Sequence, residues 1–202
     1  MNAVARWVKV VGDRVVAAAA LIALAPLLVA IAILVRITSP GPVLHRRRVL
    51  GLHGAAFDAF KFRTMVVNAD ELLRAHPQLS AAFNANSKIR NDPRVTAVGR
   101  VLRKLSLDEL PQLVNVVRGQ MSLVGPRMIA PDEADKYGAA LPKRLSVKPG
   151  MTGLWQVHGR QEIDYTQRIA LDLQYIDQWS LWLDLLILLK TIPAVLSMKG
   201  AY

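Results

Sequence analysis

The sequence contains no cysteine and only four histidines. Disulfides, thiolate metal sites and cysteine nucleophiles are therefore excluded. The histidines, His45, His53, His76 and His158, lack the spacing of metal ligands, so each is expected to be structural or exposed. A Walker A loop, a dinucleotide-binding fingerprint and a G-x-S-x-G nucleophile elbow are also missing from the sequence. The catalytic classes that depend on these motifs are not indicated.

Acidic residues are few compared with basic ones. The chain of 202 residues has 15 Asp and Glu against 26 Lys and Arg, a formal net charge of +11. Such an excess favours partners rich in phosphate: nucleic acid, anionic lipid headgroups or phosphorylated small molecules. The mean hydropathy of +0.27 is high for a soluble protein. The length suits one domain, or a small domain with a membrane anchor.

A long uncharged run, VVAAAALIALAPLLVAIAILV, occupies residues 15–35. As a straight helix it would cover about 31 Å, which is enough to cross the hydrocarbon core of a bilayer. A cleaved signal peptide fits poorly, because the run is longer than a usual signal core and no A-x-A site precedes an obvious mature start. The run therefore predicts insertion into a membrane.

Whether this segment crosses the membrane is a separate question. Basic residues flank it on both sides, and positive flanks prefer the cytoplasm, so a simple span leaves one cluster on the wrong side. Pro26 lies in the middle and kinks or breaks a helix, because it lacks an N–H and clashes with the preceding turn. A helix that enters, bends at Pro26 and returns to the same face satisfies both observations. A kinked span is the alternative, since proline is tolerated in membrane helices.

The rest of the chain predicts a mainly helical domain with a small strand pair. Residues 51–54, Gly-Leu-His-Gly, suit a turn between two short strands. Alternation along residues 56–65 places Lys61 and Arg63 on one face of the second strand. Residues 68–74 are expected to form a helix.

The C-terminal part carries two further helical patterns. One begins at Ile163, and the other covers the apolar stretch 179–196. Because Asp184, Lys190 and Pro193 interrupt this stretch, its uncharged run is too short to span a bilayer. It suits either a helix at the membrane interface or a buried core helix.

Asp108 and Glu109 form an adjacent acidic pair in the most informative part of the sequence, residues 100–127. One interpretation is a capping box, in which Ser106 and Glu109 close a helix N-terminus and Asp108 favours its dipole. The other is chemical. Free N–H groups at a helix start keep a carboxylate ionised and also attract phosphate.

Basic residues surround this pair in the sequence, and they are Arg100, Arg103, Lys104, Arg118 and Arg127. Such a cluster could hold a diphosphate beside a carboxylate that would otherwise repel it. Magnesium could neutralise the remaining charge, because it is usually held by one or two carboxylates plus substrate phosphates. The carboxylate could then attack phosphorus. For any one arginine, a solvated face or a lipid-headgroup patch is the alternative.

Several stretches carry a family resemblance in order along nearly the whole chain. They are the proline-broken apolar segment, SPGPV at 39–43, KFRTM at 61–65, NDPRVTAVGRVLRKLSLDELPQLVNVVRGQMSLVGPR at 91–127, KPGMTGLWQVHGR at 148–160 and YIDQWSLWLDLLILLKT at 175–191. In these the chain resembles the monotopic phosphoglycosyl transferases, the bacterial sugar transferase family that begins polysaccharide and glycan assembly on polyprenyl phosphate. Two positions depart from the family pattern: Met128 replaces a second proline after GPR, and Ala25 replaces a serine before the bend proline.

The resemblance implies a fold and a location. It implies a membrane-embedded monotopic domain, mainly α with a small β-hairpin, at the cytoplasmic face of the bacterial inner membrane. Residues 1–38 would form a re-entrant helix bent at Pro26. Residues 39–202 would form the catalytic domain, with amphipathic helices at the interface. The length corresponds to the catalytic part alone, without the extra membrane helices of larger relatives.

The resemblance also implies a reaction. A catalytic dyad falls on Asp108 and Glu109; the aspartate attacks the sugar-proximal phosphate of a UDP-sugar, UMP leaves, and polyprenyl (undecaprenyl) phosphate takes the phosphosugar. By matching motifs, Arg103 and Arg127 would hold phosphate and Lys61 would lie at the active site. Magnesium (Mg²⁺) would sit by Asp108. Positioning and proton handling both stay open as the role of Glu109.

The expected partners are a UDP-sugar, polyprenyl phosphate and membrane lipid, with no nucleic acid. The apolar and aromatic residues at 175–189 could face lipid or a second subunit, which leaves a homodimer open. A rival hypothesis is a non-catalytic membrane adaptor that binds anionic lipid or nucleic acid and uses the acidic pair as a helix cap. Another is a lipid-linked phosphotransferase with a CDP-alcohol donor, which ranks low because its polytopic pattern and aspartate spacing are missing.

Overall fold

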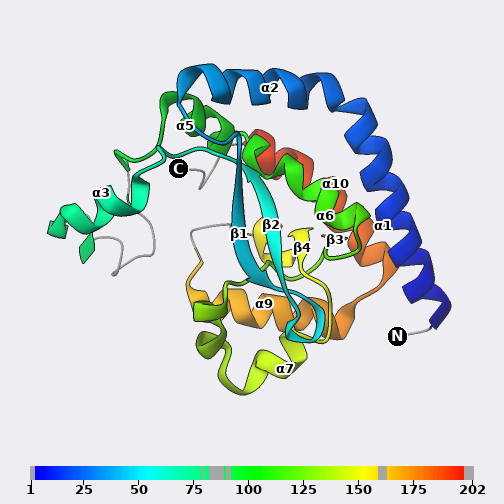
Figure 1. The fold of residues 1–202 in the computed structure, drawn as a ribbon. Helices are drawn as coiled ribbons and strands as arrows, with labels where there is room; N and C mark the ends of the chain where they lie inside the picture. Colours follow the sequence, from blue (N-terminus) through cyan, green and yellow to red (C-terminus); the bar gives the residue numbers. More distant parts are fainter. Residues whose placement is uncertain (1–2, 79, 82–88, 90–91, 159–162, 198–202) are drawn as a thin grey trace.

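The computed structural model describes residues 3–78, 80–81, 89, 92–158 and 163–197, and Figure 1 shows their arrangement. The elements in chain order are α1 (Ala3–Ala23), α2 (Ala25–Thr38), β1 (Leu44–Leu50), η1 (Leu52–Gly54), β2 (Ala56–Phe62), α3 (Ala69–Ala75), α5 (Ala97–Lys104), η2 (Leu107–Gln112), α6 (Leu113–Val117), β3 (Ser122–Val124), η3 (Pro131–Ala140), α7 (Leu141–Arg144), β4 (Gly150–Thr152), α8 (Leu154–His158), α9 (Tyr165–Gln178) and α10 (Leu181–Leu196). Labels with η are 3₁₀ helices. The prediction of a mainly helical fold with a small β-hairpin is confirmed.

Helices α1 and α2 meet at a sharp bend and follow one side of the molecule (Figure 1, blue). The break lies at Leu24, and the two helices are bent by 64°. Pro26 stands in the first turn of α2, where its missing N–H costs nothing because first-turn N–H groups have no partner within the helix. The predicted break in this segment is therefore confirmed, while the choice between re-entry and a kinked span stays a prediction. No helix in the described part of the chain is alone long and apolar enough to cross a membrane; only this bent pair meets that test together.

Strands β1 and β2 form the predicted antiparallel hairpin around the turn at residues 52–54. Lys61 lies on β2, which ends at Phe62, and the backbone N–H of Arg63 still donates to the carbonyl of Val43 at 2.8 Å. The Arg63 guanidinium donates to the carbonyls of Pro40 at 2.6 Å and Ser39 at 2.5 Å, just beyond the end of α2. The shared strand face of Lys61 and Arg63 stays a prediction. Arg63 ties the end of α2 to the hairpin.

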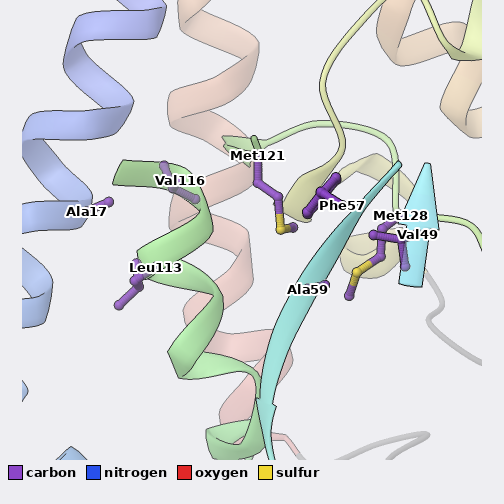
Figure 2. Close-up of a cluster of buried hydrophobic side chains, with 8 residues drawn as sticks. All are labelled: Ala17, Val49, Phe57, Ala59, Leu113, Val116, Met121 and Met128. Atoms are coloured by element: carbon purple, nitrogen blue, oxygen red, sulfur yellow. The ribbon is translucent and has the colours of Figure 1, made fainter. Parts of the chain in front are cut away.

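A core of buried side chains lies where α1, the hairpin and α6 meet, and Figure 2 shows it in close-up. Its members are Ala17, Val49, Phe57, Ala59, Leu113, Val116, Met121 and Met128. Met128, the departure from the family pattern, is 4% exposed and packs in this core. An unbranched side chain adapts its shape to irregular core space. The departure therefore places a flexible core side chain next to Arg127.

A second, parallel strand pair joins β3 to β4, with Ser122 opposite Gly150 and Val124 opposite Thr152. Gly150 begins strand β4. A Cβ added at Gly150 would lie 2.1 Å from the backbone nitrogen of Gly125. The glycine is therefore needed because two backbones approach closely, a common role for glycine in a strand.

Helices α9 and α10 follow the two C-terminal patterns. Helix α10 buries Ile187 on one face. The other face leaves large apolar side chains exposed, namely Leu181, Trp182, Leu185, Leu189 and Ile192. One face of α10 is therefore part of the core, while a position at the membrane interface stays a prediction for the other face. Asp184, also buried, accepts hydrogen bonds from Lys9 at 2.6 Å and from the Tyr175 hydroxyl at 2.7 Å, which ties α10 to α1 and α9.

Gly99 supports the packing that places the basic residues of α5. A Cβ added there would lie 2.1 Å from the backbone oxygen of Thr64, which follows β2. We predict that Gly99→Ala destabilises the protein by about 1–3 kcal/mol, because backbone must shift to relieve the clash. Thermal unfolding of the purified chain measures the change. Gly12→Ala is the matched control: nothing lies within 4 Å of its added Cβ, and alanine favours a helix interior. Equal melting temperatures for the two variants would contradict this packing.

Candidate active site

Asp108 and Glu109 lie in the first turn of η2, the short helix between α5 and α6. Ser106, immediately before it, has a left-handed backbone with φ 55° and ψ 20°, and its side chain makes no capping hydrogen bond. A capping residue needs a non-helical, typically extended backbone for its oxygen to reach the free N–H groups. The capping-box interpretation is therefore wrong. The side chain of Glu109 turns instead toward basic residues from other elements.

Glu109 lies between two cations. One of its carboxylate oxygens accepts from Lys61 Nζ at 2.6 Å and from Arg127 Nη2 at 2.9 Å. Lys61 comes from β2 and Arg127 from the segment that follows β3. Burial alone would raise the pKa of Glu109, but the charges of Arg127 and Lys61 together outweigh it and hold the pKa below its ordinary range. Glu109 is thus an ionised, fixed carboxylate, and such a group is a poor proton carrier near neutral pH.

Asp108 has a different environment although it is the next residue. Its side chain is 8% exposed. Among the described residues its carboxyl accepts no hydrogen bond and makes no ion pair. Burial raises its pKa to about 6, against the lowering effect of Lys61, and the nearby charge of Glu109 adds to the rise. Two neighbouring carboxylates whose pKa values are pushed apart are typical of an active site.

Arg103 reaches the same place from α5. Its Nε donates to the Thr64 hydroxyl at 2.8 Å, and its charge acts on the carboxyl of Asp108. Of the five basic residues expected around the acidic pair, the structure brings Arg103 and Arg127 to it, and Lys61 joins them from the hairpin. Arg100, Lys104 and Arg118 are exposed instead.

Three neighbours of the site were not predicted. His45 is the cross-strand partner of Lys61, and burial, followed by the charge of Lys61, lowers its pKa. Thr64 positions Arg103. Arg144 is fully buried and donates to the backbone carbonyl of Arg127, so it fixes that segment. Thr64 stands in the KFRTM stretch, but the pairing of His45 needs the strand register, and the role of Arg144 has no sequence signal.

Pro26 does not join the site. The helix it begins packs behind the site, where Ile31 and Val35 of α2 contact a cluster that contains Phe62 and Leu102. Phe62 and Leu102 are each adjacent in sequence to a basic residue of the site. The bend therefore orients a helix that supports β2 and α5 from behind.

Magnesium was expected beside Asp108. Within the described residues no group of three or more histidines and carboxylates could hold a metal ion. Glu109 is occupied by two cations, so Asp108 is the free oxygen donor of the pair. Magnesium usually takes one or two carboxylates and completes its shell with substrate phosphates and water. The donor set therefore fits magnesium shared between Asp108 and substrate phosphates.

Comparison with known proteins gives consistent matches over the whole site. The family model described as bacterial sugar transferase matches residues 4–198. Exopolysaccharide production protein ExoY of Rhizobium meliloti is 47% identical over 194 residues, which cover 94% of this chain and 86% of that protein. The UDP-glucose:undecaprenyl-phosphate glucose-1-phosphate transferase of Caulobacter vibrioides is 48% identical over 197 residues, covering 93% and 70%. The undecaprenyl-phosphate galactose phosphotransferase of Salmonella typhimurium is 49% identical over 166 residues, covering 80% and 35%.

The raised pKa of Asp108 has a consequence for stability. The carboxyl titrates near pH 6 in the folded chain and has an ordinary value of 3.8. The folded state favours the protonated carboxyl, so its contribution to the free energy of unfolding is full below pH 3.8 and is lost as the pH rises through about 6. We predict that Asp108→Asn, which mimics the protonated form, raises the free energy of unfolding at pH 8 by up to about 3 kcal/mol. The gain shrinks toward zero as the pH is lowered to about 4, and melting temperatures across that range measure it.

Glu109→Gln is the control, and its effect has the opposite sign. It removes the anion between Lys61 and Arg127 and leaves two largely buried cations facing each other, which costs roughly 3 kcal/mol at pH 8. A melting temperature for Asp108→Asn below that of the parent at pH 8 would show that the Asp108 carboxylate is stabilised, contrary to this account.

Proposed function

Because the chain belongs to the bacterial sugar transferase family, we propose that it transfers a sugar 1-phosphate from a UDP-sugar to undecaprenyl phosphate and releases UMP. The observation that carries this proposal is the contrast within the acidic pair: Glu109 is held by two cations, whereas Asp108 is free. Relatives that are named as undecaprenyl-phosphate transferases support the acceptor and the phosphosugar. The relative named for exopolysaccharide production supports a role at the start of polysaccharide assembly.

Asp108 is the proposed nucleophile. Its carboxylate oxygen attacks the sugar-proximal phosphorus, the bond from that phosphorus to the UMP oxygen breaks, and UMP leaves with the electron pair. An oxygen of undecaprenyl phosphate then attacks the same phosphorus, and the bond to Asp108 breaks and restores the carboxylate. A carboxylate whose pKa is raised to about 6 is a stronger nucleophile than an ordinary one and is still ionised at neutral pH.

The basic residues are proposed to handle phosphate. Arg127 contacts Glu109 and the charge of Arg103 acts on Asp108, and planar guanidinium groups suit phosphate oxygens. The fixed ion pairs of Glu109 support a positioning role for it, since it orients Lys61 and Arg127 rather than moving a proton. Magnesium bound to Asp108 and the diphosphate would neutralise phosphate charge. No residue has to be supplied by another chain in this scheme.

We also propose that the chain is embedded from the cytoplasmic face of the bacterial inner membrane. Large apolar side chains are exposed along α1, α2 and α10, which is unfavourable for a surface in water. Trp7 and Trp182 are among them, and tryptophan favours the depth of the membrane interface. The 64° bend supports re-entry of the first helix pair, because it turns the second helix away from the direction of the first. The exposed face of α10 is assigned to lipid.

The adaptor hypothesis loses its main support. It needed the acidic pair to be a helix cap, and the structure shows that Ser106 makes no cap. A polyanion-binding surface would also not explain why Lys61 and Arg127 both pair with Glu109 inside the protein.

UMP release from a panel of UDP-sugars, with the solubilised chain, magnesium and undecaprenyl phosphate, tests the reaction. We predict UMP from at least one donor and a loss of at least about a thousandfold in Asp108→Asn, because the attacking oxygen is removed. Asp58→Asn is the matched control, since Asp58 is a half-exposed carboxylate that pairs with Arg48 on the hairpin. Near-normal turnover by Asp108→Asn would remove it as nucleophile. No UMP from any donor would contradict the reaction itself.

A further inference from the structure

A cavity of about 250 Å³ lies away from the acidic pair. It is bordered by the first half of α1, by β3, by the end of α9 and by the residues just after α6. The acidic pair lies in η2, just before the start of α6, whereas Gly119, which lines the cavity, lies just after the end of α6. The cavity is not bordered by the charged residues of the candidate active site, which are Lys61, Arg103, Asp108, Glu109 and Arg127. The cavity is therefore a separate feature of the fold.

Basic side chains concentrate on its wall. Arg6, Lys9 and Arg14 come from α1, and Lys148 comes from the segment before β4. All three α1 residues border the same cavity. Lys9 is neutralised by Asp184 at 2.6 Å. In the part of the chain that the structure describes, the other three cations have no hydrogen bond or ion pair with protein.

The carboxylate in the cavity does not balance these charges. Asp13 accepts from the Ser122 hydroxyl and from the backbone N–H of Leu123 at 3.3 Å, and it lies 3.5 Å from Lys9. Burial lowers the pKa of Lys148, and the charge of Arg14 lowers it further. Arg6 and Arg14 are exposed and Lys148 is half-buried, and like charges gathered around a half-buried lysine are unfavourable unless an anion joins them. The cavity is thus electrostatically prepared for a negative ligand.

The remaining wall is mostly apolar, with Val116, Met121, Val124, Ile176 and Trp179 among its members. On the side of α1 opposite to Arg6 and Lys9, the exposed side chains are apolar, and they are Val4, Val8, Val11 and Val15. One helix therefore presents cations to the cavity and apolar side chains to the surroundings. This pattern is typical of a helix that lies at a lipid interface. It places the cavity within reach of amphiphilic molecules.

We propose that this cavity is a second phosphate site, which binds a phosphate ester through Arg6, Arg14 and Lys148 and the apolar part of that ester against the wall at Trp179. The ligand chemistry is that of an anionic phospholipid headgroup or of a free phosphate. The site does not depend on the proposed transfer reaction, because the two share no residue. Only the identification of the ligand as a phospholipid depends on the proposed membrane location.

Calorimetric titration of the full chain in a nonionic detergent tests the site. The probes are dihexanoyl phosphatidylglycerol, inorganic phosphate and the zwitterionic dihexanoyl phosphatidylcholine. We expect saturable binding of the phosphatidylglycerol and weakening by at least about tenfold in Arg14→Ala/Lys148→Ala. Arg48→Ala/Arg74→Ala, which removes the same charge from positions that do not line the cavity, keeps the parent affinity. Lys148→Gln retains most of the side-chain stem and serves if the double variant does not fold.

The three probes distinguish a lipid ligand, a soluble ligand and the absence of a site. Saturable binding of inorganic phosphate with the same dependence on Arg14 and Lys148 supports the site and identifies a soluble ligand. Equal affinities for phosphatidylglycerol in the cavity and control variants overturn it, as does equal affinity for phosphatidylcholine and phosphatidylglycerol in the parent. Absence of saturable binding of both anionic probes also overturns it. UMP release is measured on the same samples, so a failed transfer reaction is recognised apart from a failed binding site.

Discussion

The ion pairs of Glu109 with Lys61 and Arg127 join three parts of the chain: the hairpin, the helix η2 and the segment after β3. Because Lys61 and Arg127 both pair with Glu109, the adjacent Asp108 is left without an ion pair in the described part of the chain. Burial can then raise its pKa without being fully offset. An acidic dipeptide thus acquires two distinct chemical characters. Arg103 belongs to the same arrangement, since its charge acts on the carboxyl of Asp108.

The scaffold that holds this arrangement is the surface that we assign to the membrane. Helix α2 packs behind Phe62 and Leu102, and α1 packs on α6 and β3. Asp184 of α10 is bonded to Lys9 of α1 and to Tyr175 of α9. The exposed apolar faces of these helices therefore lie directly outside the supports of the site.

The sequence predicts much of this fold and the main residues of the site, because those features are local or carried by ordered motifs. The hairpin turn, the break before Pro26, the C-terminal helices and the acidic pair belong to that group. The role of Glu109 could not be predicted, because its partners Lys61 and Arg127 lie far away in the chain and a capping box explains the same local pattern. Strands β3 and β4 are too short for a periodic signal. The contacts of Arg63 with Ser39 and Pro40 are also missed, because alternation cannot show where a strand ends.

In the proposed reaction, Asp108 carries the phosphosugar between donor and acceptor. Mass spectrometry can detect this intermediate when the chain is mixed with its UDP-sugar and magnesium, without undecaprenyl phosphate, and then acid-quenched. We expect a mass increase of one sugar phosphate on the peptide that contains Asp108, and its loss when undecaprenyl phosphate is added. UMP that is released only when undecaprenyl phosphate is present, with no adduct on that peptide, would contradict it and indicate direct transfer.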